Sequence, residues 1–316
     1  MEQRRLGNSG LFVSAIGIGC NNFGGRLDQS GTRAVVDAAI DHGVNFFDTA
    51  DVYGEHLSEV MLGKALGARR HDVIIASKFG MPMGPRRHDK GGSRHYIMRA
   101  VEASLARLGT DYIDLYQIHV ADRHTPIDET LDALSDLVTA GKVRYLGHSN
   151  FSGWQIADAH WVAQTRGYAK FVTAQNHYSL LEREVANEVL PACERFKLGM
   201  LPYFPLASGL LTGKYKADEP PPAGTRLARV ERLARRSLTE ANFAVLQRLS
   251  EYAAAQDRDI LSLALCWLLS QPVIASVIAG ATTAQQVVEN VTAAEPWRLS
   301  DAEMTQVAEL LRPEQG

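Results

Sequence analysis

Four ionisable side chains stand at or just beyond the ends of short apolar runs. Asp48 ends the run Phe46-Phe47-Asp48, and Tyr53 follows five residues later. Lys78 and His119 end the next two runs of this kind. Each has an ordinary structural explanation, as a helix cap, a loop residue, a surface lysine or a core histidine. Their joint position at the ends of successive apolar runs favours a shared chemical role.

The chemistry that fits these side chains is proton transfer from a phenol. An isolated phenol has a pKa of about 10, which is too high for efficient proton donation near neutral pH. A neighbouring ammonium group favours the phenolate, so Lys78 would lower the pKa of Tyr53. Asp48 would give that lysine a countercharge, and His119 would hydrogen-bond and orient a carbonyl oxygen. The set therefore predicts general acid catalysis by Tyr53.

Short apolar runs alternate with helical periods along the whole chain, which predicts βα units and a parallel sheet. The expected strands are Ala15–Gly19, Val44–Asp48, Val73–Lys78, Ile113–His119, Val143–Ser149, Phe171–Asn176, Gly199–Tyr203 and Ser276–Ala279. Each is followed by a helix, without a change of composition between the two halves of the chain. The pattern predicts an α/β fold, a single (β/α)8 TIM barrel domain over residues 1–316, with its active site at the carboxyl ends of the strands.

The helices expected between the strands are Thr32–His42, Ser58–Leu66, Arg94–Leu108, Pro126–Ala140, Gly153–Arg166, Val185–Lys197, Thr239–Ala255 and Ala284–Ala293. An N-terminal hairpin between Arg4 and Val13 would plug the bottom of the barrel, and an extra C-terminal helix is expected from Asp301 to Leu311. Ser300 and Glu303 have the spacing of a capping box at the start of that helix. Residues 205–238 are expected to form a long loop, a feature that is usually functional or mobile.

Composition and charge exclude several classes of function. The formal net charge is −3 and the basic residues are scattered, so no nucleic-acid partner is expected. The longest strongly apolar stretch, Ile260–Leu269, is about half as long as a membrane-spanning helix, and the chain begins with Glu2, Arg4 and Arg5 rather than an apolar signal region. Its three cysteines lie far apart, which argues against a disulfide framework. We therefore expect a cytoplasmic protein without a membrane partner.

Two alternative motifs are rejected. The loop Gly17-Ile18-Gly19-Cys20-Asn21-Asn22 begins like a dinucleotide fingerprint, but its third position is Asn22 and no acidic residue follows at the right place. We expect this loop to line the mouth of the barrel, with Cys20, Asn21 and Phe23 near the cofactor or the substrate. His119 and His124 do not share a helix face, and no HxH or HExxH motif occurs, so no metal site is expected.

The chain also resembles the aldo-keto reductases, in particular bacterial members similar to potassium-channel β subunits. The match runs from Arg4-Arg5-Leu6-Gly7-Asn8-Ser9-Gly10-Leu11 through Gly43-Val44-Asn45-Phe46-Phe47-Asp48-Thr49-Ala50-Asp51-Val52-Tyr53-Gly54 to Glu289-Asn290. The resemblance implies that the catalytic tetrad of this family falls on Asp48, Tyr53, Lys78 and His119. It further implies reversible, NAD(P)H-dependent reduction of an aldehyde or ketone.

By the same resemblance, Ser149, Asn150 and Gln175 would hold the nicotinamide carboxamide, and Tyr203 would stack on the ring. Lys214 and the backbone amides of Gly209 and Leu211 would bind the pyrophosphate, and the segment from Gly280 to Asn290 would bind the adenosine end. The implied cofactor-binding residues are Gly19, Cys20, Asn21, Ser149, Asn150, Gln175, Tyr203, Phe204, Pro205, Leu206, Ala207, Gly209, Leu211, Lys214, Gly280, Thr282, Gln286, Glu289 and Asn290.

The sequence departs from the family where the 2′-phosphate of NADPH would bind. Many members carry Arg or Lys just after the Gly280 position, whereas Thr282 and Gln286 stand here and no basic residue occurs from Pro272 to Trp297. Neutral donors discriminate less than charged ones. We expect NADPH as the cofactor, with NADH as the alternative. Phe204 also replaces a serine that is often found beside the stacking tyrosine.

Two other functions stay open. A cofactor-binding sensor or regulatory subunit would bind the cofactor with negligible turnover, as the similarity to channel subunits suggests. A barrel isomerase would act without cofactor, which only the fold favours. The carbonyl substrate and the oligomeric state are not predicted by the sequence.

Overall fold

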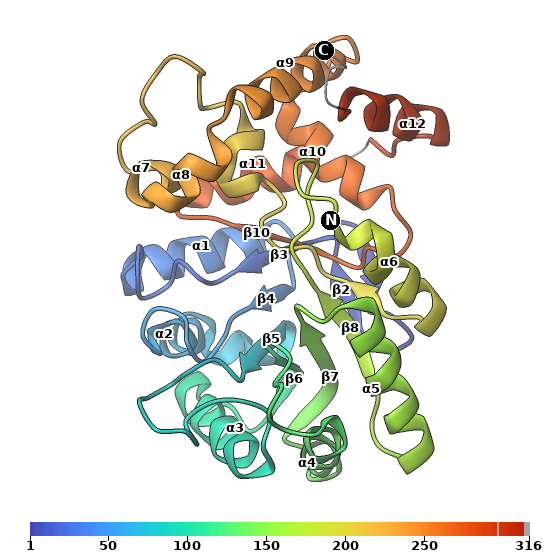
Figure 1. The fold of residues 1–316 in the computed structure, drawn as a ribbon. Helices are drawn as coiled ribbons and strands as arrows, with labels where there is room; N and C mark the ends of the chain where they lie inside the picture. The colour runs from blue at the N-terminus through green and yellow to red at the C-terminus, as the bar shows by residue number, and fades with distance from the viewer. Residues whose placement is uncertain (296, 313–316) are drawn as a thin grey trace.

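A curved parallel β-sheet surrounded by helices forms the centre of the computed structural model, which describes residues 1–295 and 297–312 (Figure 1). Within these residues the sheet has eight strands in the order β10-β3-β4-β5-β6-β7-β8-β9. The strands are β3 (Ile16–Gly19), β4 (Phe46–Asp48), β5 (Ile74–Phe79), β6 (Ile113–Ile118), β7 (Val143–Ser149), β8 (Phe171–Gln175), β9 (Gly199–Met200) and β10 (Val277–Gly280). All eight predicted strands are present.

Hydrogen bonds between the two ends of this strand order close the barrel. The amide of Met200 donates to the carbonyl of Val273 at 2.8 Å, and the amide of Ala275 donates back to Met200 at 2.9 Å. Further along both segments, the amide of Ile278 donates to the carbonyl of Pro202 at 3.0 Å. These bonds connect the chain after β9 with the segment that leads into β10, which confirms the predicted (β/α)8 barrel.

Helices surround the strands (Figure 1). They are α1 (Gln29–Asp41), α2 (Leu57–Leu66), α3 (Arg94–Leu108), α4 (Ile127–Thr139), α5 (Gly153–Arg166), α6 (Val185–Phe196), α9 (Glu240–Ala254), α10 (Ile260–Leu269), α11 (Ala284–Ala293) and α12 (Asp301–Leu310), and a 3-10 segment η1 (Gly67–Asp72) follows α2. Helix α10 was not predicted, because eight of its ten residues are buried and it has no polar face that would reveal a helical period.

The N-terminal hairpin closes the bottom of the barrel. Its strands β1 (Gln3–Arg5) and β2 (Phe12–Ser14) pair antiparallel, and Leu6 and Val13 are fully buried. Between them Gly7 has a φ of +55°, and a Cβ there would lie 2.2 Å from the carbonyl oxygen of Val172. Only glycine permits this close approach to the start of β8, so the predicted plug is confirmed.

The segment 205–238 is not the structureless loop that the sequence suggested. It contains the 3-10 segment η2 (Ala207–Thr212) and the short helices α7 (Arg226–Arg229) and α8 (Glu231–Ser237). These elements were missed because they are too short to show a periodic pattern. The extra C-terminal helix α12 begins with the expected capping box of Ser300 and Glu303.

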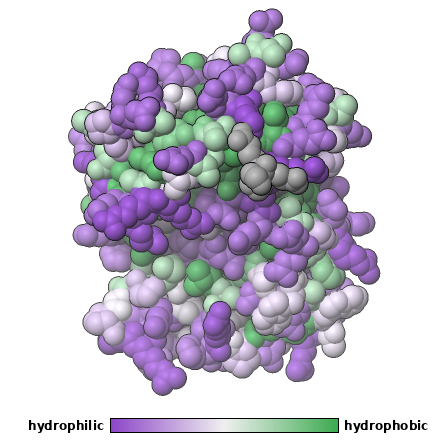
Figure 2. Space-filling view, turned by 45° about the horizontal axis from the view of Figure 1, so that its top comes forward, coloured by the Kyte–Doolittle hydropathy of each residue, from purple (hydrophilic) through white to green (hydrophobic). Residues whose placement is uncertain are grey.

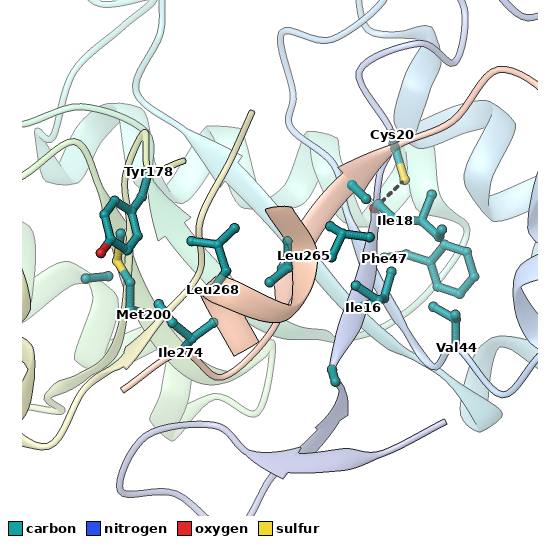
Figure 3. Close-up of a cluster of buried hydrophobic side chains, with 14 of the residues drawn as sticks. Ile16, Ile18, Cys20, Val44, Phe47, Tyr178, Met200, Leu265, Leu268 and Ile274 are labelled. Atoms are coloured by element: carbon teal, nitrogen blue, oxygen red, sulfur yellow. Dashed lines mark hydrogen bonds between the residues drawn. The ribbon is translucent and has the colours of Figure 1, made fainter. Parts of the chain in front are cut away.

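The apolar core lies between the barrel wall and the outer helices. Figure 3 shows Leu265 and Leu268 of α10 facing Ile16, Phe47 and Met200, which come from three different strands. The outer surface is mainly hydrophilic in the view of Figure 2, with hydrophobic residues gathered in its upper half. The core thus fixes the strands whose carboxyl ends carry the site.

Candidate active site

Asp48 and Lys78 meet in a buried ion pair at the carboxyl ends of β4 and β5. Nζ of Lys78 donates to Oδ2 of Asp48 at 2.7 Å and to the carbonyl oxygen of Thr49 at 2.9 Å. Lys78 is fully buried and Asp48 is 3% exposed. Two buried charges are tolerated only when they are paired and hydrogen-bonded, so the lysine is fixed in place beside the carboxylate.

The turn after β4 brings Tyr53 over this pair. The amides of Thr49 and Asp51 continue the pairing with β5 by donating to Ala76 at 2.8 Å and to Lys78 at 3.1 Å. The amide of Tyr53 then donates to the carbonyl of Ala50 at 3.2 Å, which turns the chain back toward the barrel axis. As a result, Nζ of Lys78 lies 3.5 Å from the phenol oxygen of Tyr53.

His119 completes the group from the end of β6. Its ring meets the ring of Tyr53 edge-on, with centroids 5.7 Å apart and an interplanar angle of 83°. Burial and the charge of Lys78 lower the pKa of His119 to about 3. The imidazole is therefore neutral near pH 7, and a neutral imidazole N–H can donate to a carbonyl oxygen without transferring its proton.

The balance of burial and charge keeps Tyr53 protonated. Burial raises the pKa of Tyr53, and the ammonium of Lys78 acts in the opposite direction without overcoming it. The sequence predicted only the second effect, so the expected net lowering of the pKa of Tyr53 is not found. Burial alone would lower the pKa of Lys78, but Asp48 and Tyr53 reverse this and raise it. A protonated phenol beside a charged ammonium group is the state that a proton donor needs.

A cleft of about 1400 Å³ opens above these residues. Most of the residues that the sequence singled out line it, namely Gly19, Asn21, Asp48, Tyr53, His119, Ser149, Asn150, Gln175, Tyr203, Phe204, Pro205, Leu206, Gly209, Lys214, Gly280, Thr282, Gln286, Glu289 and Asn290. Lys78 lies behind Asp48 and Tyr53 and does not line the cleft. The structure therefore brings together side chains from nearly every strand end.

Three expected cofactor residues do not line the cleft. Cys20 is fully buried, and its thiol donates to the carbonyl of Ile18 at 3.5 Å within the core (Figure 3). Burial also raises the pKa of this thiol. Leu211 is fully buried, and Ala207 is absent from the lining as well. The loop lies at the barrel mouth, but Cys20 points into the core, and Phe23 of the same loop is fully buried as well.

The backbone amides expected to bind a pyrophosphate are engaged within the chain. Gly209 donates to the carbonyl of Leu206 at 2.8 Å, and Leu211 donates to the same oxygen at 3.2 Å. Both bonds belong to η2, in which Ser208 and Gly209 have positive φ. The anion-binding capacity of the segment therefore rests on side chains rather than on these two amides.

Tyr203 is held at the bottom of the cleft by its hydroxyl group. Its O–H donates to Oδ1 of Asn150 at 2.8 Å, and Nδ2 of Asn150 donates to the carbonyl of His119 at 2.9 Å. His177 stacks on the ring of Tyr203 with centroids 5.4 Å apart and an interplanar angle of 11°. Since one face of Tyr203 is covered, a planar ligand can stack only on the other.

Three cations, Arg26, Lys214 and Arg226, line the cleft near this platform. Burial and the charge of Arg26 lower the pKa of both Lys214 and Arg226. Within the described part of the chain none of the three forms an ion pair with a carboxylate. Partly buried cations that repel one another and lack acidic partners suit a ligand with several negative charges.

Sequence reasoning missed Arg26 and Arg226 because they come from segments about 200 residues apart. The structure joins the two segments through a hydrogen bond from the guanidinium of Arg26 to the carbonyl of Gly224 at 2.8 Å. No local motif signals such a pairing. The only usable sign was the position of Arg226 in the long segment 205–238, which we expected to be functional.

The far end of the cleft is formed by the starts of α10 and α11. The amide and hydroxyl groups of Thr282 donate to Oε1 of Gln286 at 2.8 and 3.1 Å. Arg258, at the start of α10, lines the same cleft. No basic residue occurs from Pro272 to Trp297, but Arg258, just before α10, supplies a cation to this end of the cleft.

Neither a metal cluster nor a membrane-spanning helix is found among residues 1–295 and 297–312. No group of three or more His, Cys, Asp or Glu side chains in this part of the chain could hold a metal ion. None of its helices is long and apolar enough to cross a membrane.

Comparison with known proteins places the fold and the site in context. The profile of the "Aldo/keto reductase family" matches residues 15–312. The chain belongs to this family. The oxidoreductase YrpG of Bacillus subtilis, whose name marks it as uncharacterized, is 39% identical to the chain, with 93% of this chain and 91% of YrpG aligned.

Two other relatives of this aldo/keto reductase have more specific names. A probable voltage-gated potassium channel subunit beta of Oryza sativa is 38% identical over 93% of this chain and 91% of its own length. L-glyceraldehyde 3-phosphate reductase of Escherichia coli is 34% identical over 97% of this chain and 91% of its own length. The family and its oxidoreductase members support an oxidoreductase that acts on carbonyl compounds.

Proposed function

We propose that this aldo/keto reductase reduces an aldehyde or ketone to an alcohol, reversibly, with NADPH as the cofactor and NADH as the alternative. Tyr53 is the general acid. The observation that carries the proposal is the position of the Lys78 ammonium group, 2.7 Å from Asp48 and 3.5 Å from the phenol of Tyr53, below an open cleft.

The residues present fit a nicotinamide dinucleotide. The free face of Tyr203 offers a stacking surface for a planar ring, and Ser149, Asn150 and Gln175 place polar groups beside it. Arg26, Lys214 and Arg226 offer positive charge for the phosphates, and Thr282, Gln286 and Arg258 lie at the far end of the cleft. When it is bound, the reduced nicotinamide supplies a hydride to the carbonyl carbon.

The protein side chains perform the proton chemistry. The neutral imidazole of His119 donates a hydrogen bond to the carbonyl oxygen and orients it. Tyr53 gives its proton to the same oxygen as negative charge develops there. Lys78 stabilises the phenolate that remains, and Asp48 holds Lys78 in place. The burial of Lys78 and Asp48 strengthens these electrostatic interactions relative to water.

The remaining parts of the proposal concern the binding partner, the domain organisation and the location of the protein. The partner is a small-molecule carbonyl compound, and the charge distribution gives no reason to expect a nucleic acid. The organisation of residues 1–316 as a single domain and a location in the cytoplasm stay predictions from the sequence.

A spectroscopic assay tests the proposal. The purified protein is mixed with NADPH or NADH and a panel of aldehydes and ketones, and absorbance at the reduced nicotinamide band is followed. We expect substrate-dependent oxidation of the cofactor, faster with NADPH. Absence of turnover with every carbonyl compound, despite saturable cofactor binding, would contradict the reductase function.

Cofactor binding without turnover would support a cofactor-binding regulatory subunit. The similarity to the potassium channel subunit of Oryza sativa is the observation that favours this candidate. The two functions differ in turnover and not in cofactor binding, so the same assay separates them.

A further inference from the structure

The carboxylate of Asp48 receives more donors than the catalytic lysine alone. Its Oδ2 atom faces Lys78, whereas Oδ1 accepts from Nε2 of Gln117 at 3.2 Å and from Nε2 of Gln175 at 3.0 Å. A carboxylate only accepts hydrogen bonds, so both amides must turn their nitrogen atoms toward it. Asp48 is thus held from two sides, by a cation and by a pair of neutral donors.

The two amides differ in their exposure to ligands. Gln175 lines the cleft, so a ligand can compete for its amide. Gln117 is fully buried inside the barrel on β6 and does not line the cleft. Of these two neutral donors, only Gln117 is out of reach of a bound ligand.

Keeping an amide at this position has a cost. Oε1 of Gln117 is buried and has no hydrogen-bond partner among the described residues. An unsatisfied buried carbonyl is destabilising, and a methionine of similar length would fill the same space without it. Among the described residues, the contact with Asp48 is the one hydrogen bond of this side chain that offsets the loss.

The neighbouring strand leaves room for this amide. Gly147 of β7 pairs with Gln117 in the sheet register. A Cβ at Gly147 would lie 3.0 Å from Cγ of Gln117, 3.2 Å from its Oε1 and 2.2 Å from Oγ1 of Thr173. The missing side chain at this level of the barrel therefore makes space for the polar groups of β6 and β8.

We propose that Gln117 is a positioning residue that holds the carboxylate of Asp48 against Lys78. Only the kinetic consequence of this proposal rests on the function proposed above. When a ligand engages Gln175, the amide of Gln117 stays on Asp48 and keeps its second oxygen directed at the lysine. Loss of this donor removes one hydrogen bond that fixes the orientation of the Asp48 carboxylate. The ammonium group of Lys78 is then less well positioned beside Tyr53.

The first test uses the protein without cofactor. Gln117→Met removes the donor at nearly constant volume, and Thr173→Val is the matched control, because Thr173 is also fully buried and its Oγ1 has no partner among the described residues. The melting temperature of each variant is measured from about pH 8 down to about pH 3, below the ordinary carboxyl pKa of about 3.9, since a bond to an ionised group contributes only while that group is ionised.

We expect Gln117→Met to melt roughly 3–6 °C below the wild type at pH 8, as for the loss of a hydrogen bond to a charged group. The deficit should shrink toward the acid end of this range, where carboxyl groups are protonated and accept weaker hydrogen bonds. Thr173→Val should shift the melting temperature equally at every pH. A pH-independent deficit in Gln117→Met would reduce Gln117 to a packing residue and overturn the proposal.

A second variant covers the case in which methionine does not fit. Gln117→Glu has the shape of glutamine but places a second carboxylate beside Asp48. Its melting temperature should fall further below that of the wild type as the pH rises, because two like charges then face each other. A deficit that does not change with pH would again contradict a contact with Asp48.

The kinetic test follows if the wild type turns over a carbonyl substrate. Gln117→Met should lower kcat about tenfold and move the acid limb of its pH profile upward by about one pH unit, with KM for the cofactor within about twofold. An unchanged pH profile would overturn the positioning role. Absence of turnover in the wild type would contradict the reductase function alone, since the melting experiment still tests Gln117.

Discussion

The guanidinium group of Arg226 lies over the ring of Phe204, with its central carbon 4.4 Å from the ring centroid. Phe204 in turn meets Tyr203 edge-on at 5.3 Å. Cation–π contacts of this kind contribute about 0.5–2 kcal/mol. The short helix α7 is thereby fastened to the platform on which we expect the nicotinamide to stack, and the fold carries a cation to a place that no local sequence motif predicts.

Arg226→Met should raise the dissociation constant of NADPH about tenfold, because it removes a charge near the phosphates and the contact with Phe204. The affinity should also depend less on salt, since one ionic contact is lost. Fluorescence titration at low and high ionic strength measures both effects. Arg229→Met, at an exposed position of the same helix, is the control, and an equal loss in both variants would contradict the specific role of Arg226.

Tyr53→Phe should lower the turnover of an aldehyde by about 10²- to 10⁴-fold, because it removes the proton donor and leaves the ring in place. The affinity for NADPH should stay within about twofold of the wild type. Steady-state rates and a fluorescence titration give the two quantities. Tyr112→Phe, at the opposite end of β6 from His119, controls for the general effect of losing a phenol. Unchanged turnover in Tyr53→Phe would remove this residue from the mechanism.

The barrel could be predicted from the sequence because its strands are local patterns. Most strands are short apolar runs, and an ionisable residue at or just past the end of β4, β5 and β6 marks the edge that carries function. Asp48, Lys78 and His119 were predicted in this way, and Tyr53 was predicted because it follows Asp48 five residues later in the sequence. The order of these elements along the chain was enough to bring the four side chains together.

The missed features depend on the direction and distance of side chains in space. Cys20 stands in a loop at the barrel mouth, but its thiol points into the core. Arg26 and Arg226 meet only because the segment 205–238 folds across the cleft. The opposing effects on the pKa of Tyr53 could not be ranked either, because burial is a property of the folded molecule. Sequence patterns carry no information on such long-range contacts.

His119 should not titrate near neutral pH. Its pKa is lowered to about 3 by burial and by the charge of Lys78, so the native state takes up a proton there only in strong acid. In the unfolded chain a histidine takes one up below about pH 6.5, and stability is therefore lost as the pH falls from that value toward 3. NMR spectra of the imidazole groups should show the signal of His119 unchanged between about pH 8 and pH 5. A midpoint near 6.5 would contradict a neutral hydrogen-bond donor.

Gln286→Arg should tighten the binding of NADPH relative to NADH by about tenfold. The Oε1 atom of Gln286 accepts from the amide and the hydroxyl of Thr282. Arginine cannot accept these bonds, so both donors and the new guanidinium group become free to bind an anion. The dissociation constants of NADPH and NADH are measured for both proteins. Their ratio is the readout, and NADH, which has no 2′-phosphate, serves as the control. An equal change for both cofactors would show that the 2′-phosphate is not held here.

Asp51→Asn should stabilise the protein, and more so at higher pH. Asp51 is 1% exposed, and burial together with the nearby charge of Glu59 raises its pKa to about 7, although Arg107 acts against this shift. The native state therefore binds a proton that the unfolded chain releases above about pH 4, so stability falls as the pH rises from about 4 to 7 and the loss is complete above that.

The asparagine variant carries no such charge. Its melting temperature should exceed that of the wild type by roughly 3–6 °C at pH 8, and the difference should shrink near pH 5, where Asp51 is already protonated in the wild type. Calorimetry at the two pH values measures it, with Asp111→Asn at an exposed position as the control. A gain that is equal at both pH values would mean that Asp51 is not protonated in the native state at pH 5.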